Sequence, residues 1–86
     1  LPNIKVIVIR MDKVPYVDQS GVYAMEDVIN DLVAEDVTIA FTDLHGQPLE
    51  LFKKFNIVPG MIPEQYCFKN FTECSNWLEK YLENNK

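Results

Sequence analysis

Two kinds of hydrophobic pattern follow each other in the first third of the chain. Residues 4–11 are almost continuously apolar and β-branched, which predicts a strand covered on both faces. Pro15 interrupts any helix, so residues 12–18 should form a connecting loop. From Ser20 the spacing becomes helical, and this helix should end near residues 35–36. Its apolar face is expected to consist of Val22, Met25, Ile29, Leu32 and Val33.

A second apolar segment, residues 37–42, predicts another buried strand. A strand, a helix and a strand in succession form a βαβ unit, so the two strands should be parallel with a right-handed crossover. After a polar loop, Pro48 stands where the first position of a short helix tolerates proline. The helix should present Leu49, Phe52 and Phe55 on its apolar side.

The last third of the chain is less regular. Pro59, Gly60 and Pro63 predict an irregular segment, with a short edge strand at residues 65–68. Asn70 and Glu73 form a variant of the capping box at the start of a terminal helix. The predicted order is β-α-β-α-(β)-α, which is an α/β fold with a small sheet and helices packed on it. Residues 1–86 should form a single domain.

The first predicted strand would leave an unpaired hydrophobic edge on so small a sheet. We therefore expect another strand to pair with it, supplied either by sequence before Leu1 or by a second chain.

Composition narrows the classes of function. The chain carries 13 Asp and Glu residues against 8 scattered Lys and Arg residues, which argues against nucleic acid as a partner. Its apolar runs are too short for membrane insertion by this segment. Cys67 and Cys74 have neither a CxxC nor a metal-ligand spacing, so both thiols are expected to be reduced, as in the cytosol.

Candidate chemistry gathers where the first predicted helix begins, in the turn Asp18-Gln19-Ser20-Gly21. Asp18 or Ser20 could cap the helix, and a phosphate on Ser20 would gain from the helix dipole although Asp18 would repel it. Nucleotide phosphate is disfavoured because the chain has neither a GxxxxGK[ST] nor a GxGxxG motif. The turn is therefore interpreted as a helix cap on a docking surface, with charge on Ser20 as the alternative.

A second loop should lie at the same edge of the sheet. Asp43, His45 and Gly46 follow the second strand, and ligands of open α/β sheets bind outside the carboxyl ends of strands. The two loops are therefore expected to form one surface for a protein partner. A general base or a metal ligand needs partner residues, and His45, the chain's single histidine, has only Asp43 near it in sequence. No catalytic residue, metal or cofactor is therefore assigned.

Acidic residues dominate one side of the first predicted helix. They form either a solvated face or a strip that docks on a basic surface. These carboxylates are Glu26, Asp27, Asp31, Glu35 and Asp36.

The apolar strand followed by V-P-Y-V-D-Q-S-G at residues 14–21, with Leu32, resembles the STAS domain. This module is shared by anti-sigma-factor antagonists and the cytoplasmic C-terminal tails of SulP-family anion transporters. The later motifs L-H-G-Q-P, I-V-P-G-M-I-P-E and F-K-N-F-T-E-C-S-N-W-L are more similar to the transporter branch. The resemblance implies an N-terminal β-hairpin before Leu1, which this chain does not contain.

The resemblance also implies a function. It indicates a non-catalytic, cytoplasmic regulatory domain of a sulfate-type transporter in the inner membrane, which binds the membrane domain or a regulatory protein. The alternative is a free-standing anti-sigma-factor antagonist. In that branch the residue matching Ser20 is phosphorylated by a partner kinase, and the residue matching Asp18 precedes it in the turn.

Overall fold

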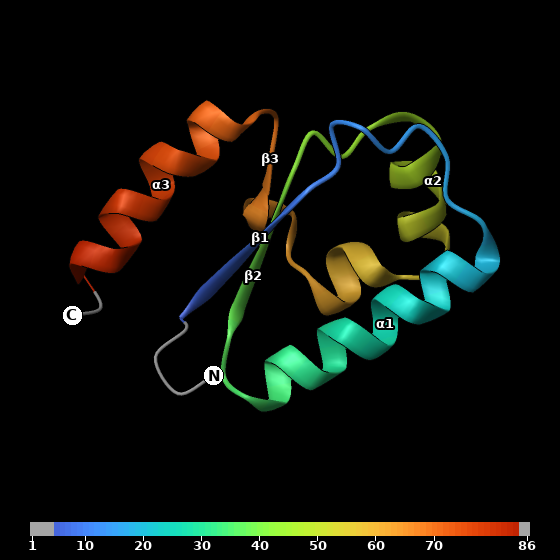
Figure 1. Ribbon diagram of the computed structural model, residues 1–86, viewed down its shortest axis with the longest axis horizontal. Helices are drawn as coiled ribbons and strands as arrows, with labels where there is room; N and C mark the ends of the chain where they lie inside the picture. The colour runs from blue at the N-terminus through green and yellow to red at the C-terminus, as the bar shows by residue number, and fades with distance from the viewer. Residues whose placement is uncertain (1–4, 85–86) are drawn as a thin grey trace.

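The computed structural model describes residues 5–84. Among these residues the sheet has three parallel strands in the order β1-β2-β3, formed by Val6–Arg10, Thr38–Thr42 and Cys67–Phe68 (Figure 1). Ile7 is aligned with Ile39 and Ile9 with Phe41. The predicted α/β class and the parallel pairing of the first two strands are confirmed. Residue 4, the expected first residue of β1, lies outside the described part.

Helix α1 (Gln19–Ala34) connects β1 to β2 and begins one residue before the predicted Ser20. Asp18 is its N-cap, and Glu35 is its C-cap. The next residue, Asp36, has a left-handed backbone with φ 63°, the conformation that often ends helices. The predicted end near residues 35–36 is therefore confirmed.

Helix α2 (Gly46–Lys54) begins earlier than the sequence suggested. Pro48 was expected at the first helical position, but it is the third residue of the helix. This position is tolerated because the first N–H groups of a helix have no intrahelical acceptor, so the proline removes no hydrogen bond.

Residues 57–68 contain two short helical segments, η1 (Ile57–Met61) and η2 (Glu64–Tyr66), before β3. The prediction of an edge strand over 65–68 was too long. The backbone N–H of Tyr66 donates to the carbonyl oxygen of Pro63 at 3.0 Å, a short-range turn that excludes residues 65 and 66 from the sheet.

Helix α3 (Phe71–Asn84) lies on the side of the sheet opposite to α1 and α2 (Figure 1). The backbone N–H of Glu73 donates to Oδ1 of Asn70 at 2.9 Å, so the cap that Asn70 was expected to provide is present. The ring of Trp77 contacts those of Phe68 and Tyr81 in tilted arrangements, with ring centroids 5.1 Å apart in each pair.

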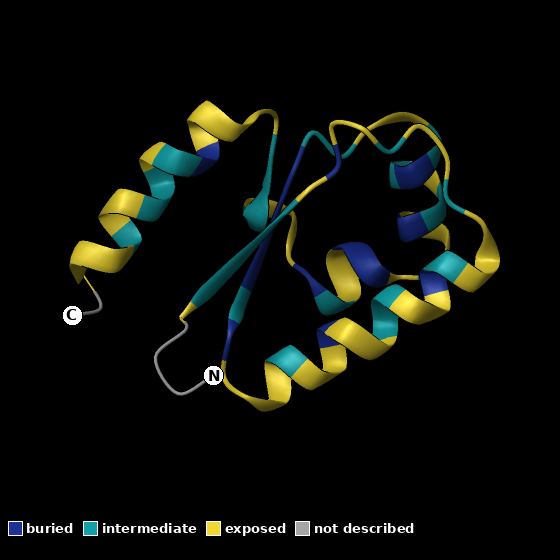
Figure 2. Cartoon of the chain, viewed as in Figure 1, coloured by how far each residue is buried: buried dark blue, intermediate teal, exposed yellow. Residues whose placement is uncertain are grey.

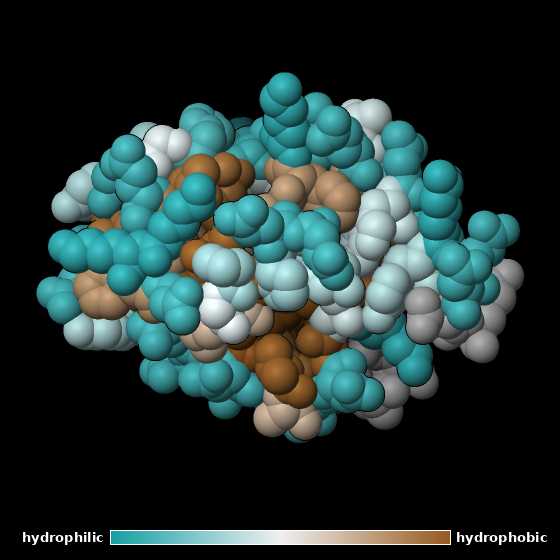
Figure 3. Space-filling model, turned by 180° about the vertical axis from the view of Figure 1, so that it is seen from behind, coloured by the Kyte–Doolittle hydropathy of each residue, from teal (hydrophilic) through white to brown (hydrophobic). Residues whose placement is uncertain are grey.

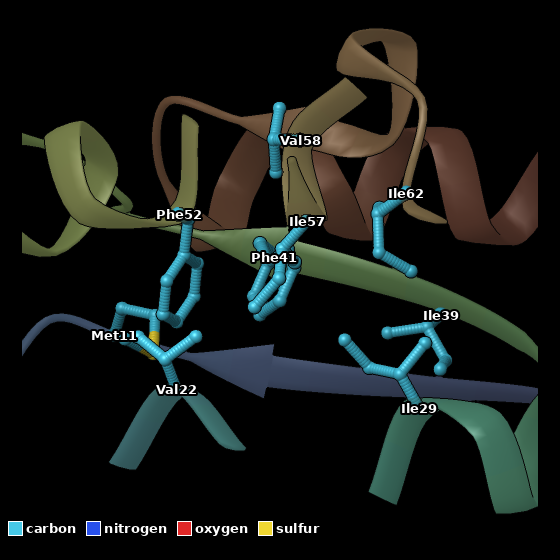
Figure 4. Close-up of a cluster of buried hydrophobic side chains, with 9 residues drawn as sticks. All are labelled: Met11, Val22, Ile29, Ile39, Phe41, Phe52, Ile57, Val58 and Ile62. Carbon is cyan, nitrogen blue, oxygen red and sulfur yellow. The ribbon is translucent and has the colours of Figure 1, made fainter. Parts of the chain in front are cut away.

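The main core lies between the sheet and the α1, α2 and η1 segments. Figure 4 shows side chains from these elements pointing toward one another, and Figure 2 shows β2 as the most deeply buried strand. The cluster consists of Met11, Val22, Ile29, Ile39, Phe41, Phe52, Ile57, Val58 and Ile62. Val33, predicted on the buried face of α1, is 55% exposed because it lies in the last turn of the helix, outside this cluster.

The outer edge of β1 has no partner strand among residues 5–84. Residues 6–9 are only half-buried although all four are aliphatic, whereas β2 is buried from Ile39 onward. The strand expected to cover this edge is therefore not among the described residues.

Candidate functional site

The turn Asp18–Gly21 is built around the capped start of α1. Oδ1 of Asp18 accepts a hydrogen bond of 2.8 Å from the backbone N–H of Gly21, and its backbone carbonyl accepts one of 3.1 Å from Val22. Asp18, and not Ser20, is thus the N-cap. Ser20 is the second residue of the helix and is exposed, as is Gln19. Capping therefore does not account for the hydroxyl of Ser20.

Gln47, in the first turn of α2, holds the loop that precedes Asp18. Its Oε1 accepts from the backbone N–H of Val17 at 2.8 Å, and its Nε2 donates to the carbonyl oxygen of Val17 at 2.7 Å. This pair of bonds satisfies both main-chain groups of one residue, as a neighbouring strand would. The loop before α1 is therefore attached to α2 at a defined point.

Gly21 lets this loop approach the helix closely. A Cβ atom at position 21 would lie 3.0 Å from Cγ1 of Val17 and 3.4 Å from Oδ1 of Asp18. The first distance is tighter than an ordinary van der Waals contact, so the absence of a side chain permits the observed approach.

An open pocket of about 370 Å³ lies between the loop and α1. Its floor is buried, because Phe52 is fully enclosed and Met11 is 5% exposed. Tyr16 lies at its rim and is 67% exposed. Asp18 and Gly21 of the turn also line it. The remaining lining residues are apolar: Val14, Val17 and Met25.

The second loop adjoins the first, but it does not line this pocket. Asp43 is half-buried and left-handed at φ 60°, and its N–H donates to the carbonyl oxygen of Phe68 at 3.0 Å. His45 is exposed and precedes α2, while Gly46 adopts φ 62°. Gln47, which follows Gly46 in the first turn of α2, connects this region to the first loop through Val17. No local sequence pattern indicated this contact.

The thiols lie away from the turn and are held in their neutral form. Burial, followed by the nearby Glu64 carboxylate, raises the pKa of Cys67 to about 11, and burial also raises the pKa of Cys74. Both cysteines are free. A thiol with a raised pKa is a poor nucleophile at neutral pH because the thiolate is the reactive form. Among residues 5–84, no group of three His, Cys, Asp or Glu side chains could hold a metal ion.

Helix α1 is acidic on its solvent side. It contains Glu26, Asp27 and Asp31 and no basic residue.

Figure 3 shows that apolar surface reaches solvent on the rear face of the molecule, between hydrophilic side chains. In the part of the chain that is described, no helix has the length and hydropathy required to cross a membrane.

Comparison with known proteins gives one family. No curated protein sequence matches the chain significantly. The model of the STAS domain, in contrast, matches residues 2–82, which include every strand and all but the last residues of α3. STAS domains are generally non-catalytic and commonly bind proteins. Both the motif at residues 14–21 and the observed α/β fold agree with this match, and the chain belongs to the STAS domain family.

Proposed function

We propose that residues 1–86 form one domain that regulates a SulP-type anion transporter from the cytoplasmic side of the inner membrane by binding another protein. The observation that carries this proposal is the exposed Asp18–Gly21 turn, which is fixed by its cap and by Gln47 beside an open apolar pocket. A rigid, exposed turn next to a hydrophobic recess is suited to recognition because little conformational entropy is lost on binding.

The chemistry around the turn favours binding over catalysis. The Asp18 carboxylate is engaged by the Gly21 amide, and the only other ionisable side chain that lines the pocket is that of Tyr16, which is exposed at the rim. A general base must lie within hydrogen-bond reach of a proton that it removes. The apolar lining and the engaged Asp18 carboxylate therefore suit the turn to positioning a partner.

Attachment to a transporter is supported by sequence similarity. The segments at residues 44–48, 57–64 and 68–78 are similar to the transporter branch of the family. In that setting the domain would bind the membrane domain or a regulatory protein. Transport itself would take place in membrane helices outside residues 1–86.

A second candidate is a free-standing anti-sigma-factor antagonist that is switched by phosphorylation of Ser20. The observation that favours it is the position of Ser20, which is exposed in the first turn of α1 and is not needed as the cap. A phosphate there would gain from the helix dipole and would add negative charge to the docking surface.

The first experiment is to determine the complete open reading frame that encodes this chain. Several apolar helices upstream of residue 1 would support the transporter assignment, and their absence would overturn it. In the full protein, sulfate uptake by cells would then be measured for Ser20→Ala, Ser20→Asp and Thr72→Asp. Thr72 is the matched control because it is also the exposed second residue of a helix, α3.

We expect Ser20→Asp to change uptake several-fold, whereas Ser20→Ala and Thr72→Asp remain near the wild-type rate. Equal effects of the two aspartate variants would contradict a specific role for the turn. If the open frame encodes no membrane span, intact-mass analysis after incubation with cell lysate tests the antagonist instead. An added phosphate that is lost in Ser20→Ala would support it.

A further inference from the structure

We propose that the pocket beside the Asp18–Gly21 turn binds an apolar side chain carried on a basic segment of the protein partner. This inference rests on the proposed function, because it names the chemistry of the partner at the same surface. It follows from three features: the apolar interior of the pocket, the Asp18 carboxylate in its lining at the start of an acidic helix, and a fixed wall.

The interior is suited to an anchoring side chain. With a volume of about 370 Å³, the pocket is within the range of ligand sites, whose lower bound is roughly 300 Å³. Phe52 and Met11 form a buried floor, and Met25 lines the α1 side. Methionine side chains adapt to different apolar groups. Burying one aliphatic or aromatic side chain in such a recess is how a few residues dominate a protein interface.

The surrounding charge selects a basic segment. Asp18 lines the pocket, and α1 continues from it with three carboxylates and no basic residue. The basic residues on the neighbouring elements are Arg10 and Lys13, before α1, and Lys53 and Lys54, which follow Phe52 at the end of α2. Nε of Arg10 lies 3.9 Å from Oδ1 of Asp12. The excess along α1 is therefore negative, in a chain with a net charge of −5. Lys or Arg residues flanking the anchor would complement this surface.

The outer wall is already in place. Residues 14 and 16–18 line it, and Gln47 fixes Val17 through both main-chain groups. Tyr16, exposed at the rim, can close over an inserted side chain with its ring while its hydroxyl stays in water.

Methionine methyl groups provide a direct test. The chain has three methionines; Met11 and Met25 line the pocket, while Met61 lies in η1 outside it. The probe is a helical Lys/Ala peptide with one central Leu, added to the chain labelled with ¹³C at the methionine methyl groups. We expect the Met11 and Met25 signals to shift and the Met61 signal to stay.

Three comparison peptides separate the contributions. Replacing the central Leu by Ala, or every Lys by Glu, should weaken binding at least about tenfold, as expected for loss of an anchor or of charge complementarity. An uncharged Gln/Ala peptide with the same Leu should also bind more weakly. If it binds as tightly as the Lys peptide, the pocket takes apolar groups regardless of charge, and the proposal is overturned.

Two pairs of variants complete the test. Met25→Gln should weaken binding of the Lys/Leu peptide about tenfold, whereas Met61→Gln, the same change at another half-buried methionine, should alter it less than about twofold. Asp18→Asn keeps a capping side chain but removes the charge, and its control is Asp36→Asn, the same change at an exposed residue beyond the C-terminal end of α1. Asp18→Asn should weaken binding more than its control.

Equal effects within either pair would overturn the assignment to this pocket. The proposal would also be overturned if the Met11 and Met25 signals did not shift with the Lys/Leu peptide. Shifts of both signals with protein concentration, in the absence of peptide, would likewise overturn it, because they would assign the pocket to a second copy of the chain. The peptide assay uses no transporter. An unaltered transport rate in Ser20→Asp would thus overturn the proposed function while these shifts persist.

Discussion

At the scale of single residues, Gln47 fixes the loop before α1 from a distance of thirty positions along the chain. Its amide satisfies the N–H and the carbonyl of Val17, a half-buried residue whose main-chain groups have no strand partner. A buried main-chain group that loses its partner costs more than the net value of the bond it made. The conformation of the turn therefore depends on a side chain outside it.

We expect Gln47→Ala to lower the free energy of unfolding by about 1–3 kcal/mol, because two hydrogen bonds to Val17 are lost. Urea denaturation gives this value, and amide hydrogen exchange should show faster exchange at Val17. The control is Gln65→Ala, which changes an exposed glutamine and should stay within about 0.5 kcal/mol of wild type. Equal losses in the two variants would show that the contact with Val17 contributes nothing.

Cys67 gives a pH-dependent prediction. Burial and Glu64 raise the pKa of its thiol from 9.0 to about 11 in the folded state. Between these values the unfolded chain releases a proton that the folded chain keeps, so stability should fall as pH rises from 9 to 11. Urea denaturation across this interval should show a smaller decline in Cys67→Ser. An identical decline in both proteins would contradict the assignment to Cys67.

At the scale of elements, the start of α1 depends on the Asp18 side chain. Removing its bond to the Gly21 amide in Asp18→Ala should cost about 1 kcal/mol of stability, whereas Asp18→Asn keeps an acceptor and should cost a few tenths. Thermal unfolding followed by circular dichroism distinguishes the two. If Asp18→Asn destabilised the chain as much as Asp18→Ala, the charge and not the cap would be the stabilising feature.

The regular elements could be predicted because each carries its own local signal. The β-branched run of β1 and the helical spacing in α1 are carried by residues that lie close together in the sequence. The burial of single residues within an element was harder to predict. Val33 has the spacing of a core residue, yet 55% of it is exposed, because spacing describes a helix face and not what covers each turn of it.

The candidate site could be predicted only in part, because local sequence patterns do not describe contacts between distant residues. Asp18, Ser20 and Gly21 are adjacent in sequence, so the turn was visible as a pattern. The contact between Gln47 and Val17 and the pocket floor at Phe52 depend on how α2 packs against the loop, and no short motif encodes that packing. Because a glutamine beside a proline is typical of a loop, the sequence did not indicate that Gln47 contacts Val17.

At the scale of the whole molecule, the sheet is thin and its two covered faces differ. The radius of gyration is 12.8 Å, somewhat above the roughly 12 Å typical of a compact domain of this length. Figure 1 shows α3 alone on one face of the sheet, while α1 and α2 share the other. With so few strands, the outer edge of β1 is a large part of the sheet's exposed backbone.

This edge predicts self-association of the chain. The outer side of β1 has no partner among residues 5–84, and its aliphatic residues 6–9 are only half-buried. Such an edge is a template for pairing with another strand, and a lysine within an edge strand suppresses that pairing. Sedimentation velocity should therefore show larger species as the concentration of the chain rises, and Val8→Lys should keep it monomeric.

Val33→Lys is the matched control for this variant. It also places a lysine at a valine and changes the net charge by the same amount, but it lies on α1, where 55% of the side chain is exposed and no strand can pair. Circular dichroism verifies that both variants retain the fold. If the association is a strand-pairing reaction, Val33→Lys should associate as the wild type does. A monomeric Val33→Lys would instead assign the association to net charge or to the apolar surface of α1.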